Sequence, residues 1–342
     1  MTDRRSAVPP EATRLREIAL SGGRAAAVRA AAKLGIADVL GDEPATLAEL
    51  ASATDTDPVA LERLLRALTW HGVFAEHEDG RFVHTASSLL LREADPHSVK
   101  YIVLWGTEPW TWELWPHLEV AVRSGKSVFP ALHDKGFFEY LGADAPESAE
   151  IMDRAMIQSS NLSVRAIADT LDLTETDSVA DICGGRGQVL AALMERNPGV
   201  TGTLFDRQGA VDTADPRLRA GGEFADRARL VAGDCREAVP IEADAYILKS
   251  ILDWDDESTI STLENIAASA KPGARVFVIE NLLDGEHRGF STSMDLLLML
   301  NVGGRKRTTA AFTALIEKAG LHVRDVRPID TYLHVIESTV GA

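Results

Sequence analysis

Apolar side chains recur at helical spacing through the first part of the chain. In segment 14–40 they return every three or four positions, and Gly35 is a natural helix stop. Segment 46–74 predicts two more helices, with Pro58 near the start of the second. Segment 74–85 then alternates around Glu78-Asp79-Gly80, which predicts a β-hairpin. Helices followed by such a hairpin give a winged-helix outline.

From Ser178 onward the pattern changes to short apolar strands that alternate with helices. Helical segments such as 188–199 and 258–273 lie between several of the strand candidates, which are 178–183, 201–206, 228–234, 243–250 and 274–280. This alternation predicts a parallel, doubly wound sheet, and two extended stretches within 321–339 are expected to close it. We therefore expect an α/β protein with a winged-helix-like dimerisation or packing domain at 1–100, a helical connector at 101–165 and a Rossmann-like domain at 166–342.

The charge balance and the cysteine count narrow the possible partners. Thirty-five basic against 52 acidic residues give a formal net charge of −17, which repels nucleic acid and anionic membranes. The second helix of the winged-helix outline carries only Arg63 and Arg66 as cations, so packing or dimerisation is favoured over DNA binding. The chain shows no signal-peptide core, no apolar run long enough to span a bilayer, and only two cysteines, too few for a disulfide framework. We expect a cytoplasmic protein that binds neither nucleic acid nor membrane.

A glycine-rich turn lies directly between a predicted strand and a predicted helix, in VADICGGRGQVLAALM. Backbone amides at such a helix start suit a closely approaching ligand. The GxGxxG pattern of hydride-transfer enzymes fits at Gly185 and Gly187 but fails at Leu190, so a dinucleotide is disfavoured. Asp206 closes the second strand, 25 residues beyond Asp181, where a carboxylate can accept both hydroxyls of a ribose. Strand-terminal acids at one edge of the sheet predict a nucleotide-like ligand there.

The order of the motifs DICGGRG, LFD, AGD, ILKS, DWDDE and GGRKRT resembles that of the S-adenosylmethionine-dependent O-methyltransferases of the plant caffeate and bacterial polyketide type. The likeness covers nearly the whole chain. It implies a homodimer, S-adenosylmethionine as cofactor with S-adenosylhomocysteine as its product, and an acceptor pocket to which the connector at 101–165 contributes. By position, the expected cofactor-binding residues are Asp181, Gly185, Gly187, Asp206, Arg207, Gly233, Asp234, Cys235, Lys249, Ser250 and Ser160. Cys183 stands where the turn usually has its first glycine.

The chain departs from this family at the residue that removes the acceptor's proton. The family pattern is leucine–histidine–aspartate–tryptophan, but ILDWDDE puts either Leu252 or Asp253 at the histidine position. One of the two acids that orient the histidine is retained as Glu280, and Lys306 in GGRKRT replaces the other. We take Asp253, Glu280 and Lys306 as the catalytic candidates. His117 and His133 are possible substitute bases. Helix capping is the favoured role for Asp255 and Asp256 and an alternative role for Asp253.

Aromatic and methionine side chains in the connector and near the C-terminus predict a flat, apolar acceptor pocket. The residues expected to line it are Trp110, Met156, Trp254, Met294, Asp295, Met299 and Asn301. The basic run 305–307 is either a solvated loop or a partner for a substrate carboxylate. No metal is expected, because consecutive acids such as those at 253–257 seldom converge on one ion.

The leading functional hypothesis is methyl transfer to a hydroxyl of a small aromatic or polyketide natural product, with carbon or nitrogen as alternative target atoms. Such a reaction would rely on proximity and an acidic acceptor rather than on a histidine base. An alternative is a cofactor-binding but non-methylating protein that resembles the anthracycline hydroxylases, which lack the histidine. A ligand-sensing winged-helix regulator is a third, non-enzymatic possibility, and its cation-poor recognition helix argues against it.

Overall fold

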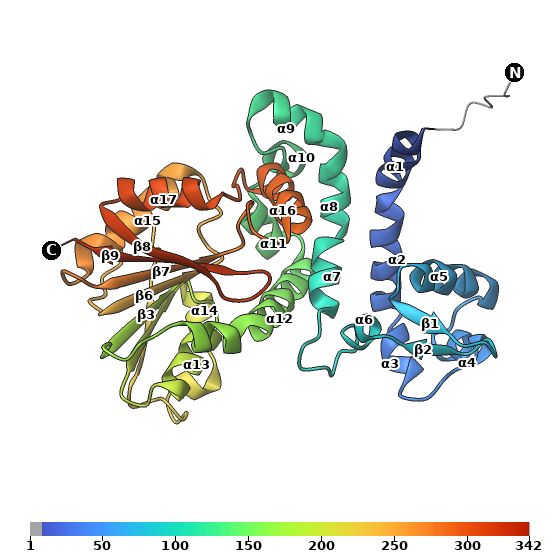
Figure 1. The fold of residues 1–342 in the computed structure, drawn as a ribbon, viewed down its shortest axis with the longest axis horizontal. Helices are drawn as coiled ribbons and strands as arrows, with labels where there is room; N and C mark the ends of the chain where they lie inside the picture. Colours follow the sequence, from blue (N-terminus) through green and yellow to red (C-terminus); the bar gives the residue numbers. More distant parts are fainter. Residues whose placement is uncertain (1–8, 342) are drawn as a thin grey trace, which may run out of the picture. The chain divides into compact units, whose positions relative to one another are not determined.

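The computed structural model describes residues 9–341, which separate into two compact units (Figure 1). The first unit contains the residues up to Trp112 together with Pro146–Ser159. The second contains Glu113–Ala145 and the chain from Ser160 onward. Residues of the region 101–165 therefore belong partly to one unit and partly to the other.

The first unit is a helical domain with one small hairpin. Its helices are α1 Pro10–Ala19, α2 Ser21–Lys33, α3 Ile36–Leu40, α4 Leu47–Ala53, α5 Pro58–Trp70, α6 Ala86–Leu89, α7 Lys100–Gly106, the start of α8 Pro109–Leu114 and the first part of α12 Pro146–Thr170. The hairpin pairs β1 Phe74–Glu76 with β2 Phe82–His84. Local signals set the boundaries: Thr46 and Glu49 form a capping box on α4, and Asp57 caps α5 ahead of Pro58. The predicted order of helices and hairpin is confirmed.

The second unit is built on a seven-stranded sheet in the order β5-β4-β3-β6-β7-β9-β8. The strands are β3 Ser178–Ile182, β4 Thr201–Asp206, β5 Ala228–Ala232, β6 Ala245–Lys249, β7 Arg275–Glu280, β8 Leu321–Pro328 and β9 His334–Val340. Strands β3 to β7 all run parallel to one another, whereas β9 runs antiparallel to both β7 and β8. The predicted doubly wound α/β sheet, closed by two terminal strands, is confirmed.

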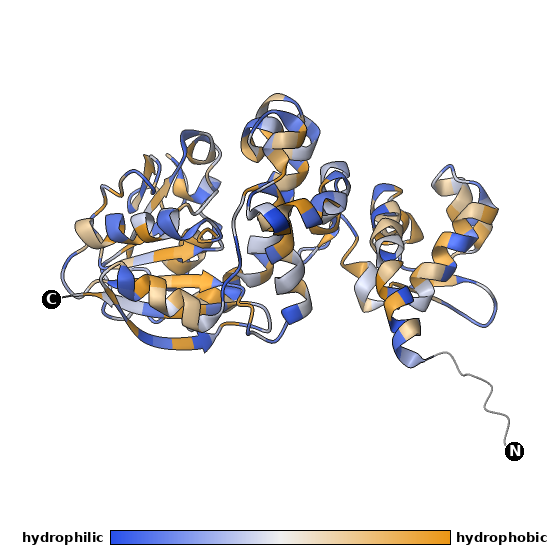
Figure 2. Cartoon of the chain, turned by 90° about the horizontal axis from the view of Figure 1, so that it is seen from above, coloured by the Kyte–Doolittle hydropathy of each residue, from blue (hydrophilic) through white to orange (hydrophobic). Residues whose placement is uncertain are grey.

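Helices cover both faces of this sheet (Figure 1). α13 Gln188–Arg196 and the end of α12 Pro146–Thr170 pack on one face, and α15 Asp256–Ser269 and α17 Thr309–Lys318 pack on the other. The remaining helical segments are η1 Trp115–His117, α9 Leu118–Ser124, α10 Phe129–His133, α11 Phe137–Ala143, α14 Gln208–Asp212, η2 Pro216–Leu218 and α16 Arg288–Asn301. Figure 2 shows mostly hydrophobic colour on the sheet and mixed colours on its helices, the pattern of strands buried on both faces. Within residues 9–341, no helix is both long and apolar enough to cross a membrane.

The parallel strands end at one common edge of the sheet. Because β3, β4, β6 and β7 run in the same direction, the turns that follow Ile182, Asp206, Lys249 and Glu280 meet there. In open α/β sheets, ligands bind at the carboxyl ends of the strands. The fold therefore directs attention to this edge, which we call the carboxyl edge.

In the first unit, Glu93 joins two distant segments, since it accepts hydrogen bonds from Lys100 at 3.0 Å and Arg154 at 2.6 Å. The hydrogen bonds from Lys100 and Arg154 lower the pKa of Glu93 to about 2 from its ordinary 4.5. The stabilisation is therefore present above the unfolded value and is lost as pH falls toward 2. We expect Glu93→Gln to lower the free energy of unfolding at pH 7 by up to about 1 kcal/mol, because the site is partly exposed. The loss should shrink in unfolding measurements as the pH falls below about 4.5.

Glu78→Gln, in the exposed hairpin turn, is the matched control and should change nothing at either pH. A Glu93→Gln effect that is equal at pH 7 and pH 3 would contradict the ionic origin of this contact.

Candidate active site

The glycine-rich turn after β3 needs a backbone that most residues avoid. Gly185 and Gly187 have φ of +60° and +78°, and Cys183 has φ of +53°. A side chain at Gly184 would place its Cβ 2.4 Å from the carboxylate of Asp181. Cys183 takes the left-handed conformation at a cost of about 1 kcal/mol, which a glycine would avoid. The turn is thus pressed directly against the end of β3, as a closely approached ligand requires.

Two carboxylates lie beneath and beside this turn. Asp181 is 1% exposed, and neither of its oxygens accepts a hydrogen bond of ordinary geometry. Burial, and next the charge of Asp206, raise the pKa of Asp181 to about 7. Asp206 accepts the backbone N–H of Gly185 at 2.8 Å and that of Arg207 at 2.6 Å, while burial raises its pKa. This concentration of negative charge in a buried place is costly unless a cation or a set of hydrogen-bond donors binds there.

Other predicted cofactor residues lie near the ends of β5 and β6. Gly233 has no room for a Cβ, which would come 2.5 Å from the ring of Phe205. Asp234 is paired with Arg236 at 2.6 Å, and that hydrogen bond lowers the pKa of Asp234 well below its usual range. Cys235 is 1% exposed, so its thiol does not line an open groove.

At the end of β6, Lys249 is mostly enclosed, and burial lowers its pKa although Glu280 and Asp181 attract its charge. Ser250 follows with φ of +54° and is exposed. Ser160 lies on α12, where its carbonyl accepts a hydrogen bond from Ser163 at 3.4 Å. Lys249 is thus a half-buried cation at the carboxyl edge, beside the acids.

Three charged side chains meet in the interior behind the edge. Lys306 Nζ lies 2.7 Å from Asp253 Oδ2 and 3.2 Å from Glu280 Oε2. The side chain of Lys306 is 5% exposed and that of Glu280 is fully buried. We call Asp253, Glu280 and Lys306 the acid–lysine cluster. The sequence named all three as catalytic candidates, and the structure brings them into direct contact.

The acid–lysine cluster gains or loses one proton near neutral pH. Burial, followed by repulsion from Asp253, raises the pKa of Glu280 to about 7, against the attraction of Lys306. Burial alone would lower the pKa of Lys306, but Glu280 and Asp253 outweigh it and raise the pKa above the ordinary range. Lys306 therefore stays charged, and Glu280 is the group through which the cluster changes charge near pH 7.

The structure also settles the roles of the neighbours of Asp253. Leu252 is fully buried in the core beside α15, so Asp253 is the residue that faces the cluster. The helix N-cap is Asp255, which accepts the N–H of Ser258 at 2.8 Å, so the capping role weighed for Asp253 is wrong. Lys306 is engaged by two carboxylates of its own chain, which leaves it no role as a solvated loop cation.

Neither candidate histidine stands out as a base. His133 packs against Phe129 and Tyr140, with ring centroids at 4.3 Å and 4.5 Å, and its Nε2 lies 3.6 Å from Glu113. His117 lies in the short helix η1. His133 is therefore packed among aromatic side chains, and its contacts do not favour it over Asp253 as the base.

The predicted acceptor residues are divided between the two units. Trp110 and Met156 belong to the first unit, whereas Trp254 and the α16 residues belong to the second. In the second unit, Asp295 Oδ1 accepts the backbone N–H of Lys306 at 2.7 Å and so fixes the loop that carries the lysine. Asn301 is buried, with its side-chain oxygen on the N–H of Val302, and Met294 and Met299 are half-buried.

Sequence reasoning missed two residues beside the cluster. Arg307 is 3% exposed and donates to the carbonyls of Leu252 at 2.6 Å and Trp254 at 2.7 Å, which clamps the segment carrying Asp253. Tyr332 lies in the β8–β9 connection, and burial raises its pKa, with further effects of Lys306, Asp253 and Glu280. The basic run 305–307 was the only sequence signal for Arg307, and none pointed to Tyr332.

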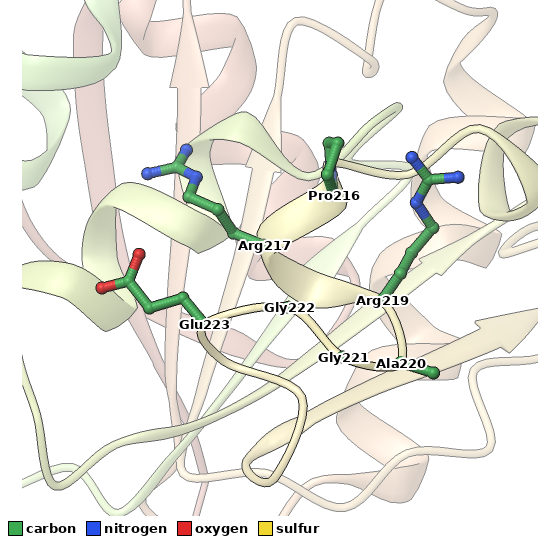
Figure 3. A pocket seen from close by; sticks show the side chains of 7 residues that line it. All are labelled: Pro216, Arg217, Arg219, Ala220, Gly221, Gly222 and Glu223. Atoms are coloured by element: carbon green, nitrogen blue, oxygen red, sulfur yellow. The ribbon is translucent and has the colours of Figure 1, made fainter.

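An open hollow elsewhere in the second unit does not have the features of a reaction site. It is lined by Pro216, Arg217, Arg219, Ala220, Gly221, Gly222 and Glu223. Figure 3 shows the guanidinium groups of Arg217 and Arg219 on opposite sides of Pro216, pointing away from each other. Because Arg217 is already paired with Asp215 at 2.9 Å, these charges do not converge on one ligand.

Comparison with known proteins adds an independent finding. Residues 115–322 match the family model of the O-methyltransferase domain, and residues 20–93 match that of the O-methyltransferase dimerisation domain. The mitomycin biosynthesis 6-O-methyltransferase of Streptomyces lavendulae is 35% identical over 308 residues, which cover 89% of this chain and 87% of that protein. Aclacinomycin 10-hydroxylase RdmB of Streptomyces purpurascens is 34% identical over 308 residues, 88% of this chain and 82% of its own. The solved structure of CalO1, a methyltransferase in calicheamicin biosynthesis in its SAH-bound form, has a TM-score of 0.88 at 32% identity and covers 100% of both chains.

The burial of Asp181 has a testable consequence for the ligand-free protein. Its folded pKa of about 7 exceeds the ordinary 3.8, so the penalty is absent below the unfolded value and grows as the pH rises to 7. We expect Asp181→Asn to raise the free energy of unfolding at pH 8 by roughly 1–3 kcal/mol and to change it little at pH 4. Thermal or denaturant unfolding at the two pH values measures this, with exposed Asp226→Asn as the unaffected control. Equal or lower stability of Asp181→Asn at pH 8 would refute the assignment.

Proposed function

The chain belongs to the O-methyltransferase family, and on that premise we propose that it transfers the methyl group of S-adenosylmethionine to a hydroxyl of a small aromatic or polyketide molecule. The observation that carries the proposal is the pair of carboxylates, buried Asp181 and half-buried Asp206, against the glycine-rich turn. Relatives named for O-methylation in antibiotic biosynthesis support the reaction and the substrate class.

The residues at the carboxyl edge fit this cofactor. Asp206 ends β4, where its carboxylate can accept the two ribose hydroxyls, and Gly185 in the turn at 183–187 has open space where a Cβ would lie, so that a ligand can approach the backbone closely. Asp181 and Asp206 give the edge the negative charge that suits a sulfonium cation. Solved relatives with SAH bound support the same cofactor here.

When bound, the cofactor supplies a methyl group on a positively charged sulfur that is already activated for transfer. The protein then has to hold the acceptor hydroxyl in line and take its proton. A phenol with a pKa of about 10 is mostly protonated at neutral pH, so a base at the reacting oxygen increases the rate.

Asp253 is the residue best placed to accept that proton. Its Oδ2 is held by Lys306, whereas its Oδ1 is buried and has no hydrogen-bond partner among the described residues. A buried carboxylate oxygen without a donor is costly, and an acceptor hydroxyl provides the missing donor. Lys306 orients the carboxylate, and Arg307 fixes the backbone on both sides of it.

The charge of the acid–lysine cluster explains why an aspartate can serve. With both carboxylates ionised beside one ammonium, the cluster carries one net negative charge, and taking up one proton makes it neutral. Glu280 has a pKa of about 7, so it is the group whose protonation changes the charge of the cluster near neutral pH. In this proposal the cluster takes the acceptor's proton, which is the task of the histidine elsewhere in the family. This replaces the hypothesis from the sequence, in which an acidic acceptor reacts without a protein base.

We also propose that the protein is a homodimer. The match to a dimerisation domain at residues 20–93 supports this. So does α1, which buries none of its own residues and exposes Leu15 and Ile18 at 67% and 58%. Apolar side chains in such a row are typical of a surface that a second subunit covers.

The hydroxylase alternative has one point in its favour, the similarity to RdmB. The acid–lysine cluster favours methyl transfer instead, because a positioned proton acceptor is what an acceptor hydroxyl requires. Reaction with methyl-labelled cofactor separates the two: label in the product supports transfer, and an unlabelled oxidised product supports hydroxylation.

The cofactor site predicts a loss of binding when Asp206 is changed. Asp206→Asn should weaken S-adenosylhomocysteine binding at least about tenfold, or 1.4 kcal/mol, because a charged hydrogen-bond acceptor for the ribose is lost. Isothermal titration calorimetry measures this, with Asp212→Asn on exposed α14 as the control that keeps its affinity. Unchanged affinity in Asp206→Asn, with normal unfolding of the free protein, would remove the foundation of the proposed function.

The acid–lysine cluster predicts a characteristic pH profile. In the wild type, kcat/KM should rise with pH through about 7, where Glu280 ionises, and then level off. Asp253→Asn should lower kcat by about 10²- to 10⁴-fold, the usual worth of a positioned base. Glu280→Gln should flatten the rise near pH 7 while retaining part of the activity, because Asp253 remains.

Asp255→Asn is the matched control, since asparagine also caps α15 and the residue points away from the cluster's contacts. If Asp253→Asn kept both the wild-type rate and the wild-type pH profile, ionisation of the acceptor alone would explain the reaction.

A further inference from the structure

The only two cysteines of the chain lie in contact although 52 positions separate them. Cys183 begins the glycine-rich turn after β3, and Cys235 follows β5, on the other side of β4. Their sulfur atoms are 3.0 Å apart, and both thiols are free. In a chain of 342 residues with two cysteines, this contact at the carboxyl edge has no place in the methyl-transfer chemistry described above.

The two cysteines are held very differently. Cys235 is 1% exposed and packs in the core beside α15, and its carbonyl accepts Asn265 Nδ2 at 2.9 Å. Cys183 is half-buried, and its backbone is in the left-handed conformation. Cys235 is thus the fixed partner, and Cys183 is the reachable one in a turn that already carries strain.

We propose that Cys183 and Cys235 form a reversible disulfide under oxidation by peroxide, and that this modification weakens cofactor binding. The second half of the proposal rests on the proposed function, since it assumes the cofactor at the carboxyl edge. The first half, formation of the bond, does not.

The chemistry balances with hydrogen peroxide as the oxidant. The Cys183 sulfur takes one peroxide oxygen, the O–O bond breaks, and a sulfenic acid and one water form. The Cys235 sulfur then attacks the Cys183 sulfur, the S–S bond forms, the S–O bond breaks, and a second water leaves. Two thiols lose two electrons and two protons, and one peroxide becomes two waters.

The close contact also eases the first deprotonation of the pair. The hydrogen bond between the sulfurs lowers the pKa of Cys235 and raises that of Cys183, so the first proton leaves Cys235. Transfer of the Cys183 proton to Cys235 across the 3.0 Å contact then makes Cys183, the half-buried sulfur, the thiolate that meets peroxide. A thiolate within reach of its resolving partner is the arrangement that redox-sensitive cysteine pairs need.

Closing the bond must move the turn. An S–S bond is about 2.05 Å long, so the sulfurs have to approach from 3.0 Å. Cys235 is anchored in the core, so the displacement falls on Cys183 and on the turn that follows it. Gly185 in that turn donates its N–H to Asp206 at 2.8 Å, and this contact positions the carboxylate for the ribose. Because coupling between two sites is reciprocal, bound cofactor should in turn oppose the disulfide.

The test uses the purified full-length chain, first reduced and then treated with hydrogen peroxide. We expect intact-mass analysis to show loss of two hydrogen atoms, and peptide mapping to join the Cys183 and Cys235 peptides. Calorimetry with S-adenosylhomocysteine should show affinity reduced about tenfold or more in the oxidised protein and restored by dithiothreitol, a typical size for coupling between sites. Saturating S-adenosylhomocysteine should slow the disulfide's formation.

Two variants serve as controls. Cys183→Gly suits the backbone φ of +53°, and Cys235→Ala keeps a small apolar side chain in the core, so one remains informative if the other folds poorly. In each variant, affinity should be the same with and without peroxide. The proposal is overturned if both thiols stay alkylatable after peroxide, or if the disulfide forms and affinity does not change. Failure of the reduced protein to bind the cofactor would instead sink the proposed function and leave the disulfide result standing.

Discussion

Burial of the Lys306 ammonium between Asp253 and Glu280 is the interaction on which the proposed reaction site depends. The three residues come from the β6–α15 connection, the end of β7 and the loop after α16. A buried charge is tolerated only when its partners are in place, so loss of one member leaves the others uncompensated. The same contacts that hold these segments together also set the charge available for taking a proton. The pairing of Lys306 with Asp253 and Glu280 thus serves both the stability of the fold and the proposed proton transfer.

Much of the fold could be predicted because the relevant signals are local. The strand 275–280 is apolar from Val276 to Ile279, Pro58 and Asp57 mark the start of α5, and Glu78-Asp79-Gly80 marks the hairpin turn. Asp206 was identifiable as well, since a carboxylate closing a parallel strand lies at the ligand edge by topology alone. These inferences needed only the spacing of apolar residues, the residue types at turns and the direction of the strands.

The rest of the site depends on contacts that no local pattern contains. From the sequence, Lys306 was interpreted as the loss of an acid that supports the base. In the structure it pairs with the carboxylates of Asp253 and Glu280, which lie 53 and 26 positions away in the chain. Helix capping was expected first of all for Asp255 and Asp256, and Asp255 does cap α15. No local pattern shows, however, that Asp253 pairs with Lys306. The cysteine contact was equally invisible, because it forms between the ends of two strands with a third strand between them. In each case the role of the residue depends on a contact with a residue far away in the sequence, which local propensity does not predict.

The antiparallel placement of β9 has a consequence for how the protein is made. β9 pairs with β7 along its whole length, and His334 lies opposite Glu280 in the register. Until that strand has left the ribosome, β7 is an open sheet edge and Glu280 has no shelter from water. The nascent chain can therefore fold its amino-terminal unit early, whereas Glu280 is sheltered along this edge only once β9 has paired with β7.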